Sequence, residues 1–373
     1  MKGVPVAPLP GPDFAAGVMA WQRQHGRHGL PWQATKDPYR VWLSEVMLQQ
    51  TQVTTVLDYY ARFLQRFPTV ADLAAAPLDD VFSLWSGLGY YSRARNLHAC
   101  AQAVVAQHGG AFPRTAEALV TLPGIGRSTA AAIAAFCFGE RVAILDGNVK
   151  RVLSRALGFQ GDLARSGPQA ELWAAAHTLL PSRGVDTYTQ GLMDLGATLC
   201  TTRRPACERC PVAEGCVARA EGTPERYPVK SRRLVRKHRE HALLWLQRGP
   251  QLWLVQRPGT GVWAGLWTLP EYPSTGALEA ATQGWPGQGD WLPTIQHALT
   301  HFDWTLHPLR WTWPAHGDEP EGLPAGRWFS IEEALALGLP APIRRLLSAT
   351  QLPATEPAPP GRRRTAPSGG SER

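Results

Sequence analysis

The stretch Leu-Pro-Gly-Ile-Gly-Arg-Ser-Thr, residues 122–129, decides the fold of this chain. It predicts a turn between two helices, because Gly124 and Gly126 interrupt helix-forming residues and an alanine-rich segment follows. Glycines let the backbone approach a ligand closely, and the N–H groups that open the second helix attract phosphate oxygens. We therefore expect a phosphate-binding turn that reads no sequence, although an ordinary glycine-rich turn has the same pattern.

The residues around this turn predict two kinds of structure along the chain. Residues 13–199 are expected to be almost entirely helical, since apolar side chains recur every three or four positions, as from Val53 to Leu64. From His241 the pattern changes to short segments rich in Trp, Leu and Val, with a helix expected at 331–339. This order predicts an all-α module followed by an α/β domain.

The charge of the chain favours a polyanionic partner. Its 373 residues carry a formal net charge of +8, with basic residues concentrated at 230–239 and 362–364. A solvated linker or tail explains these two runs equally well. No apolar stretch reaches transmembrane length, and prolines occupy the place of a signal peptide's apolar region. We therefore expect a soluble protein of the cytoplasm, by default a bacterial one, with no membrane partner.

Four cysteines, Cys200, Cys207, Cys210 and Cys216, cluster at the end of the helical region. A disulfide framework suits a small secreted domain, which this chain does not resemble, so a metal site is favoured. Structural zinc sites usually have two short Cys-x-x-Cys pairs, and this segment has one. Intervals of six, two and five residues modestly favour an iron–sulfur cluster over zinc.

Two carboxylates, Glu45 and Asp146, are candidates for acid–base chemistry. Asp146 precedes a helical pattern and is suited to cap the helix N-terminus, where amide hydrogen bonds would keep it ionised. Glu45 lies on or beside the apolar face of a helix, so its pKa is either ordinary or raised by partial burial. One charged and one protonated carboxyl group are what cleavage of a glycosidic bond requires.

Three further motifs strengthen this interpretation. They are Ser-Glu-Val-Met-Leu-Gln-Gln-Thr-Gln-Val (44–53), Gly-Leu-Gly-Tyr-Tyr (87–91) and Leu-Asp-Gly-Asn-Val (145–149). With the glycine turn and the cysteines, they resemble the endonuclease III superfamily and, within it, the MutY-type adenine DNA glycosylases. The resemblance implies an all-α helix–hairpin–helix glycosylase module with an iron–sulfur cluster loop. Its substrate would be double-stranded DNA with adenine opposite 8-oxoguanine or guanine, and its cofactor a [4Fe–4S] cluster on the four cysteines.

The C-terminal region resembles a Nudix fold, notably in Gly-Val-Trp-Ala-Gly-Leu-Trp (261–267). It lacks the Arg-Glu-x-x-Glu-Glu helix that Nudix hydrolysis needs, so the resemblance implies readout of 8-oxoguanine instead. The expected divisions are a catalytic module at 1–223, a basic linker at 224–240, the Nudix-like domain at 241–348 and a disordered tail at 349–373. Within the module, 30–144 would form the helix–hairpin–helix subdomain, and the N-terminal helix with 145–223 the iron–sulfur subdomain.

The resemblance also implies catalytic roles. Glu45 would protonate adenine N7, Asp146 would stabilise the cationic deoxyribose, and Asn148 would orient the reacting groups. Ser128 stands where lyases of the superfamily carry a lysine, and a hydroxyl group cannot form a Schiff base with the sugar. We therefore expect a monofunctional glycosylase in which Ser128 positions the sugar or the catalytic water.

The residues expected to contact DNA fall into five groups. By resemblance, Leu30 and Trp32 would line the adenine pocket. Gln50 and Tyr90 would form a wedge in the duplex, and Thr51 and Leu88 would contact the 8-oxoguanine side. Phosphate contacts are expected from Gly124, Gly126, Arg203, Arg204 and Arg209. The lesion-reading loop would be Leu299, Thr300 and His301, where the family usually has Phe at the first position. Tyr90, Leu88 and Trp32 could instead be ordinary packing residues.

Two other functions fit parts of the pattern. One is an endonuclease III-like glycosylase and lyase for oxidised pyrimidines, which Ser128 and Glu45 disfavour. The other is a non-catalytic DNA-binding protein with a structural metal, which the pair Glu45 and Asp146 disfavours. The chain is expected to act as a monomer.

Overall fold

The structure, a computed structural model, describes residues 13–231, 236–315 and 319–349. The predicted tail from residue 350 onward, and Arg232 and Arg233 of the basic run, lie outside these residues. No helix in the described ranges is long and apolar enough to cross a membrane.

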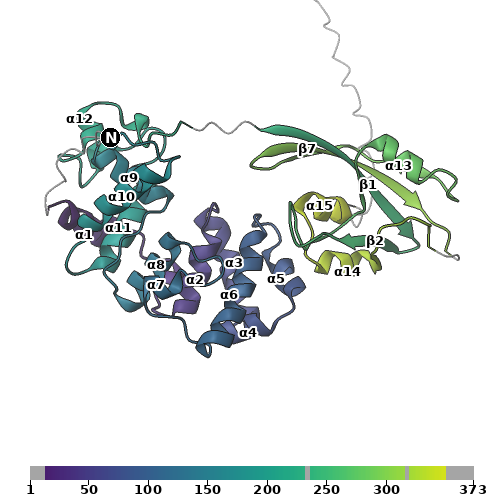
Figure 1. Cartoon of the computed structure of the whole chain (residues 1–373), viewed down its shortest axis with the longest axis horizontal. Coiled ribbons are helices and arrows are strands. Elements are labelled where there is room, and N and C mark those ends of the chain that lie inside the picture. The colour runs from purple at the N-terminus through teal and green to yellow at the C-terminus, as the bar shows by residue number, and fades with distance from the viewer. Residues whose placement is uncertain (1–12, 232–235, 316–318, 350–373) are drawn as a thin grey trace, which may run out of the picture.

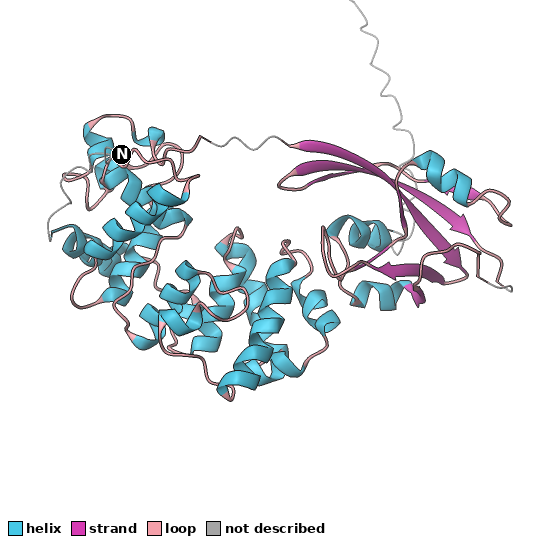
Figure 2. Cartoon of the chain, viewed as in Figure 1, coloured by secondary structure: helices cyan, strands magenta, loops and turns pink. Residues whose placement is uncertain are grey.

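Helices dominate the chain up to Ala220, as the sequence predicts (Figures 1 and 2). Their bounds are α1 (Asp13–His25), η1 (Pro31–Gln33), α2 (Pro38–Met47), α3 (Val53–Arg66), α4 (Val70–Ala75), α5 (Leu78–Trp85), α6 (Ser92–His108), α7 (Ala116–Leu119), α8 (Arg127–Phe138), α9 (Gly147–Ala156), α10 (Ser166–Thr178), α11 (Val185–Thr198), η2 (Cys207–Arg209), α12 (Val217–Ala220) and η3 (Pro224–Arg226). The prediction of a helical region over 13–199 is confirmed.

Helix α8 joins the two hydrophobic cores of the helical part. Ala130, Ile133 and Ala134 pack into a core built mainly from α2 to α7, while Ala132 and Ala135 pack into a core with α1, α9, α10 and α11. The small alanine side chains let helices from both sides approach α8 closely. Helix α2 packs into the first of these cores and α9 into the second, so α8 lies between the helices that carry Glu45 and Asp146.

The glycine turn lies between α7 and α8, as predicted. Gly124 has φ +74°, and a Cβ atom there would lie 2.5 Å from Cβ of Asn96. Only glycine fits both this left-handed backbone and this close approach. Gly126 is the N-cap of α8, so the free amides of that helix open beside the turn.

The C-terminal part is a mixed sheet with three helices. Its elements are β1 (Lys237–Arg248), β2 (Gln251–Gln256), β3 (Trp267–Thr268), β4 (Glu271–Tyr272), α13 (Thr275–Ala281), β5 (Gly289–Trp291), β6 (Ile295–Ala298), β7 (Phe302–Thr312), β8 (Arg327–Ser330), α14 (Ile331–Ala336) and α15 (Ala341–Ala349). The strand order is β3-β2-β1-β7-β5, with β4 on β1, β6 on β7 and β8 on β2. The helix expected at 331–339 is α14, whereas the sequence pattern did not reveal α13 and α15.

Strand β1 begins within the segment predicted to be a linker. Its first residues pair in parallel with β7, starting at Lys237 opposite Phe302. The charged run 236–240 resembles a linker in sequence, but backbone pairing with β7 gives it strand structure. Further along, Leu243 and Trp245 face a core with α14 and α15, and Leu244 and Leu246 face the core on the other side.

The strand-rich part is anchored to α5 and α6 of the helical part (Figure 1). The Tyr91 hydroxyl group donates to the carbonyl oxygen of Leu339 at 2.9 Å. Leu266 is buried in the helical core, and the backbone at Gly338 lies against Phe82. A buried hydrogen bond and buried apolar contacts thus hold the two parts in one arrangement.

Candidate active site

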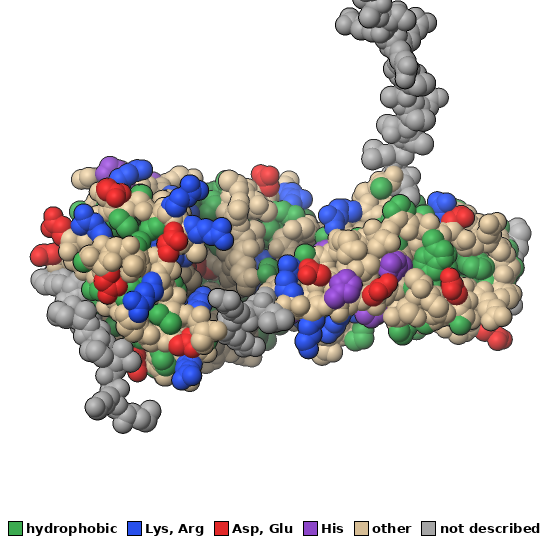
Figure 3. All heavy atoms as spheres, turned by 90° about the horizontal axis from the view of Figure 1, so that it is seen from above, with side chains coloured by type: hydrophobic (Ala, Val, Ile, Leu, Met, Phe, Trp, Pro, Cys, Tyr) green, Lys and Arg blue, Asp and Glu red, His purple; other side chains and the backbone are tan. Residues whose placement is uncertain are grey.

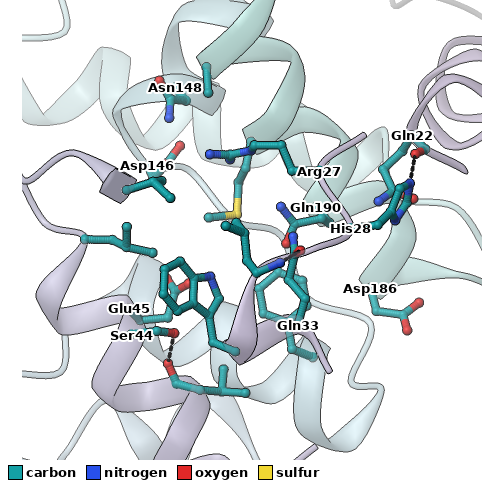
Figure 4. A pocket seen from close by; sticks show the side chains of 18 of the residues that line it. Gln22, Arg27, His28, Gln33, Ser44, Glu45, Asp146, Asn148, Asp186 and Gln190 are labelled. Atoms are coloured by element: carbon teal, nitrogen blue, oxygen red, sulfur yellow. Dashed lines mark hydrogen bonds between the residues drawn. The ribbon is translucent and has the colours of Figure 1, made fainter. Parts of the chain in front are cut away.

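A cleft of about 570 Å³ brings together most of the predicted catalytic and pocket residues (Figure 4). Six of them line it: Leu30, Trp32, Glu45, Thr51, Asp146 and Asn148. They come from η1 and the loop before it, from α2 and the loop after it, and from the start of α9. The volume lies in the range of pockets that bind small ligands such as a single nucleobase.

Glu45 lines the cleft and is half-buried. Burial, and secondarily the nearby charge of Asp146, raise its pKa to about 8. Among the described residues, its carboxyl group has no hydrogen-bond partner, so nothing stabilises its charged form. Of the two alternatives for Glu45, the geometry favours the one in which burial raises its pKa.

Asp146 is the N-cap of α9, as the sequence predicts, and its Oδ1 accepts a hydrogen bond from the Val149 amide at 2.7 Å. Burial raises the pKa of Asp146, while the amides of Val149 and Asn148 and the cations Arg151 and Lys150 act in the opposite direction. The predicted amide hydrogen bonds to Asp146 are present and favour its ionised form, but burial has the larger effect on its pKa. The amides still make Asp146 the member of the pair that ionises first.

Asn148 is held in place by a chain of hydrogen bonds. Its Oδ1 accepts from Arg151 Nη2 at 2.9 Å, and the same guanidinium donates to the carbonyl oxygens of Gly196 and Cys200 at 2.6 and 2.7 Å. With its oxygen occupied, the amide nitrogen is left to face the cleft (Figure 4). It lies beside Asp146 as a donor of fixed orientation.

The cleft also has polar residues that the sequence did not reveal. Asp194 is fully buried and accepts from Arg27 Nε at 2.7 Å and from Gln190 Nε2 at 2.8 Å, which fixes both side chains in the cleft wall. Arg27 and Asp194 are 167 residues apart, so no local pattern connects them. These groups surround the space with hydrogen-bond donors and acceptors suited to a polar base.

Trp32 lies both at the cleft and in the helical core. Its ring lines the cleft, and it also packs edge-on against Tyr60 at 5.3 Å between ring centroids. The side chain is 7% exposed. Packing therefore holds the ring rigidly at the cleft wall.

A second hollow, of about 260 Å³, contains Gln50, Tyr90 and Gly124. Gln50 and Tyr90 have φ values of +59° and +49°, backbone conformations that side-chain-bearing residues rarely adopt. Arg93 fixes both loops, because its guanidinium donates to five carbonyl oxygens of residues 46–49 and 88–89 and to the Thr51 hydroxyl group. The two strained turns are thus held side by side at the surface.

Two predicted DNA contacts differ sharply in exposure. Tyr90 is 45% exposed, so its interpretation as a packing residue is wrong. Leu88 is only 6% exposed and belongs to the helical core, as that alternative holds. Ser128 lies in the first turn of α8 and is not among the side chains that line the cleft.

Residues 299–301 form the tip of the hairpin between β6 and β7. The Leu299 amide donates to the Phe302 carbonyl oxygen at 2.9 Å, which closes the turn. Leu299 is half-buried against the C-terminal core, while Thr300 and His301 are exposed. The Thr300 hydroxyl group is 2.9 Å from the Tyr90 hydroxyl group, so the predicted reading loop touches the predicted wedge.

The four cysteines line one apolar cavity beside Arg155. The Arg155 guanidinium is buried and donates to Cys200 Sγ at 3.3 Å. In the described ranges, no group of three or more His, Cys, Asp or Glu side chains is close enough to hold a metal ion.

Arg203, Arg204 and Arg209 are exposed on the loop that carries the cysteines. Figure 3 shows basic and acidic side chains interspersed on one face of the molecule.

Comparison with known proteins places these features in a family. The profile of the HhH-GPD superfamily of base excision DNA repair proteins matches residues 43–174, and that of the NUDIX domain matches residues 241–349. A solved thermostable thymine-DNA glycosylase is 28% identical, with a TM-score of 0.51, and the match covers 56% of this chain and 95% of that chain.

Two curated relatives match most of the chain. The adenine DNA glycosylase of Buchnera aphidicola from Acyrthosiphon pisum is 33% identical over 343 residues, which cover 90% of this chain and 96% of the relative. The adenine DNA glycosylase of Homo sapiens is 35% identical, covering 86% of this chain and 70% of the relative. Both span the helical and the strand-rich parts. The chain therefore belongs to the adenine DNA glycosylases, base-excision repair enzymes of the helix–hairpin–helix superfamily that act on DNA.

Proposed function

We propose that this enzyme releases adenine opposite 8-oxoguanine or guanine and leaves an abasic site. The observation that carries the proposal is the pairing of Glu45, with a pKa of about 8, and Asp146 in one cleft. Both carboxyl groups face a space of nucleobase size. To reach it, adenine has to leave the base stack, which costs a few kcal/mol and less at a mismatch.

Glu45 is suited to protonate N7 of the extruded adenine. Protonation lets adenine depart as a neutral molecule, whereas unassisted departure would leave an anion. A carboxyl group with an ordinary pKa would be ionised at neutral pH and could not donate. Burial in the cleft keeps the proton on Glu45 until the base arrives.

Asp146 and Asn148 are suited to stabilise the sugar. As the glycosidic bond breaks, positive charge develops on the deoxyribose, and an ionised carboxylate nearby lowers the energy of that state. The Val149 amide holds Asp146 in place, and Arg151 holds Asn148. Water then adds to the sugar carbon and completes the abasic site.

A monofunctional reaction follows from the lack of a lysine at position 128, because Ser128 cannot form a Schiff base. Lys36 lines the cleft, but it is exposed at the rim and its ammonium group pairs with Asp186 at 3.2 Å. Ser128 is proposed only to position the sugar or water as DNA binds.

Selectivity for 8-oxoguanine is assigned to the surface where the two parts meet. Tyr90 and Gln50 project from strained turns held by Arg93, and Thr300 contacts Tyr90. A wedge at this point would enter the duplex opposite the extruded adenine. Thr300 has the hydroxyl group needed to bond an oxidised purine edge.

The four cysteines are proposed to bind a [4Fe–4S] cluster. Four thiols that line a single cavity supply the donor set such a cluster needs, and Arg155 stabilises thiolate charge at Cys200. The cluster would staple the loop that presents Arg203, Arg204 and Arg209 to phosphates. A brown colour with broad visible absorbance would support an iron–sulfur cluster. Anaerobically purified protein that is colourless and contains zinc would contradict this proposal. The enzyme is further proposed to act as a monomer in the cytoplasm.

The test uses an end-labelled duplex with adenine opposite 8-oxoguanine under single-turnover conditions. The expected strand break appears only after alkali, and breakage without alkali would refute the monofunctional assignment. Glu45→Gln and Asp146→Asn should each abolish release while duplex binding remains. Glu171→Gln is the matched control, because that carboxyl group is exposed on α10 away from the cleft. Near-normal release by either cleft variant would contradict the assigned roles.

A further inference from the structure

The segment 259–264, between β2 and β3, is held by the helical part of the enzyme. Arg95 of α6 donates through Nη1 to the carbonyl oxygens of Gly259 and Ala264, at 3.1 and 3.2 Å. Trp263 of this segment packs against both the helical core and the C-terminal core. The segment therefore connects α6 with the sheet.

The Trp263 ring lies against both strands of the 299–301 hairpin. It stacks on Trp304 of β7 at 4.6 Å between centroids and 18° between planes, and it tilts against His297 of β6 at 5.5 Å. These two residues flank the turn on its two sides. Trp263 thus packs at the base of the loop that is proposed to read the lesion.

The backbone at Trp263 is strained, with φ +56°. For a bulky aromatic residue this conformation is an outlier that persists only where the surroundings enforce it. The enforcing contacts are the Arg95 hydrogen bonds on one side and the ring stack on the other. On the far side of the stack, Trp304 Nε1 donates to His241 Nδ1 at 2.8 Å, which fixes the second ring.

The hairpin is therefore tied to the helical part at two points. Its tip is held by the exposed hydrogen bond between Tyr90 and Thr300, and its base by the stack that leads to Arg95. An exposed hydrogen bond contributes little, and it breaks when Tyr90 enters DNA. The buried stack then remains as the contact between the hairpin and the helical part, while Arg236 of the same strand-rich part still donates to the Leu299 carbonyl oxygen at 2.8 Å.

We propose that Trp263 is a positioning residue for discrimination of the base opposite adenine. It does not line the cleft, and it acts through Trp304 and His297 on the orientation of residues 299–301. This inference rests on the proposed function of that loop. It gives the motif at 261–267 a role in this enzyme that does not require nucleotide hydrolysis.

The test compares single-turnover adenine release at limiting enzyme concentration on duplexes with adenine opposite 8-oxoguanine and opposite guanine. Trp263→Ala should slow adenine release opposite 8-oxoguanine and leave release opposite guanine unchanged. The ratio of the two rates should therefore fall about tenfold. Trp263→Phe should restore most of the ratio, because a ring still stacks on Trp304. The control is Trp285→Ala, which removes contacts with Trp311 and Trp313 on the opposite face of the sheet. It should leave the ratio unchanged.

Each outcome either supports or overturns the role of Trp263. A preserved ratio in Trp263→Ala, or an equal loss in Trp285→Ala, would overturn the inference. If Trp263→Ala fails to fold, Arg95→Ala replaces it: this variant loses the anchor of segment 259–264 and should lower the ratio in the same direction. An unchanged ratio in Arg95→Ala would overturn the inference, too. A wild-type enzyme that shows no preference would refute the proposed 8-oxoguanine selectivity and this inference together, although adenine release itself would stand. A loss of preference confined to the variants leaves the proposed function intact.

Discussion

The protonated state of Glu45 makes the stability of the enzyme depend on pH. Its pKa is about 8 in the folded enzyme and 4.5 for a solvated group. The folded state therefore binds the Glu45 proton more tightly than the unfolded state does. The contribution to stability is complete below pH 4.5, declines as pH rises toward 8 and is lost above it.

The size of this effect follows from the two pKa values. At 1.36 kcal/mol for each pH unit, the difference corresponds to on the order of 3–5 kcal/mol of unfolding free energy between pH 5 and pH 9. Glu45→Gln keeps the shape of the side chain but cannot ionise. The variant should therefore lose this portion of the pH dependence and become more stable than the wild type at pH 9.

The assay is urea-induced unfolding of the DNA-free enzyme at several pH values from 5 to 9. The difference between the unfolding free energies of wild type and Glu45→Gln isolates the titration of this one group. Glu171→Gln is the control, and its curve should parallel the wild type because that carboxyl group is exposed on α10, outside the cleft. Parallel curves for wild type and Glu45→Gln would refute the claim that Glu45 carries a proton at neutral pH.

Three further predictions concern rate, loop anchoring and DNA binding. Because Glu45 acts as an acid, single-turnover adenine release should fall about tenfold for each pH unit above about 8, and a flat profile would contradict this. Arg93→Ala leaves five carbonyl oxygens without their donor. Denaturation should show that the free energy of unfolding falls by roughly 3–5 kcal/mol, and a decrease below about 1 kcal/mol would contradict the anchoring role. Gly124→Ala forces a Cβ within 2.5 Å of Asn96, so duplex affinity measured by anisotropy should fall for every sequence, while Gly167→Ala, where the space is open, should bind normally.

Local sequence patterns predicted the features of this site that depend on neighbouring residues. Asp146 caps α9 because its partner amide is three residues away, and the glycine turn forms from eight consecutive residues. The convergence of Glu45 with Asp146 depends on tertiary packing, because α2 and α9 belong to two cores that share α8. Only the resemblance to a known family indicated that convergence.

Features that depend on tertiary packing could not be predicted from the sequence. The capping rule predicts a low pKa for Asp146, but burial in the folded cleft reverses the direction. Arg27 and Gln190 enter the cleft only because both bond to the buried Asp194. The strained backbone at Trp263 follows from contacts of two separate parts of the chain, which no local preference encodes.

The central claim is that one cleft carboxyl group is protonated and the other is charged at neutral pH. Infrared difference spectra of wild type minus Glu45→Gln, recorded from pH 6 to pH 9, test it most directly. The account predicts the carbonyl stretch of a protonated carboxyl group at pH 7, which disappears as pH rises through about 8. The matching spectrum for Asp146→Asn should show an ionised carboxylate at pH 7. A carboxylate signal from Glu45 at pH 7, or a protonated signal from Asp146, would contradict the account.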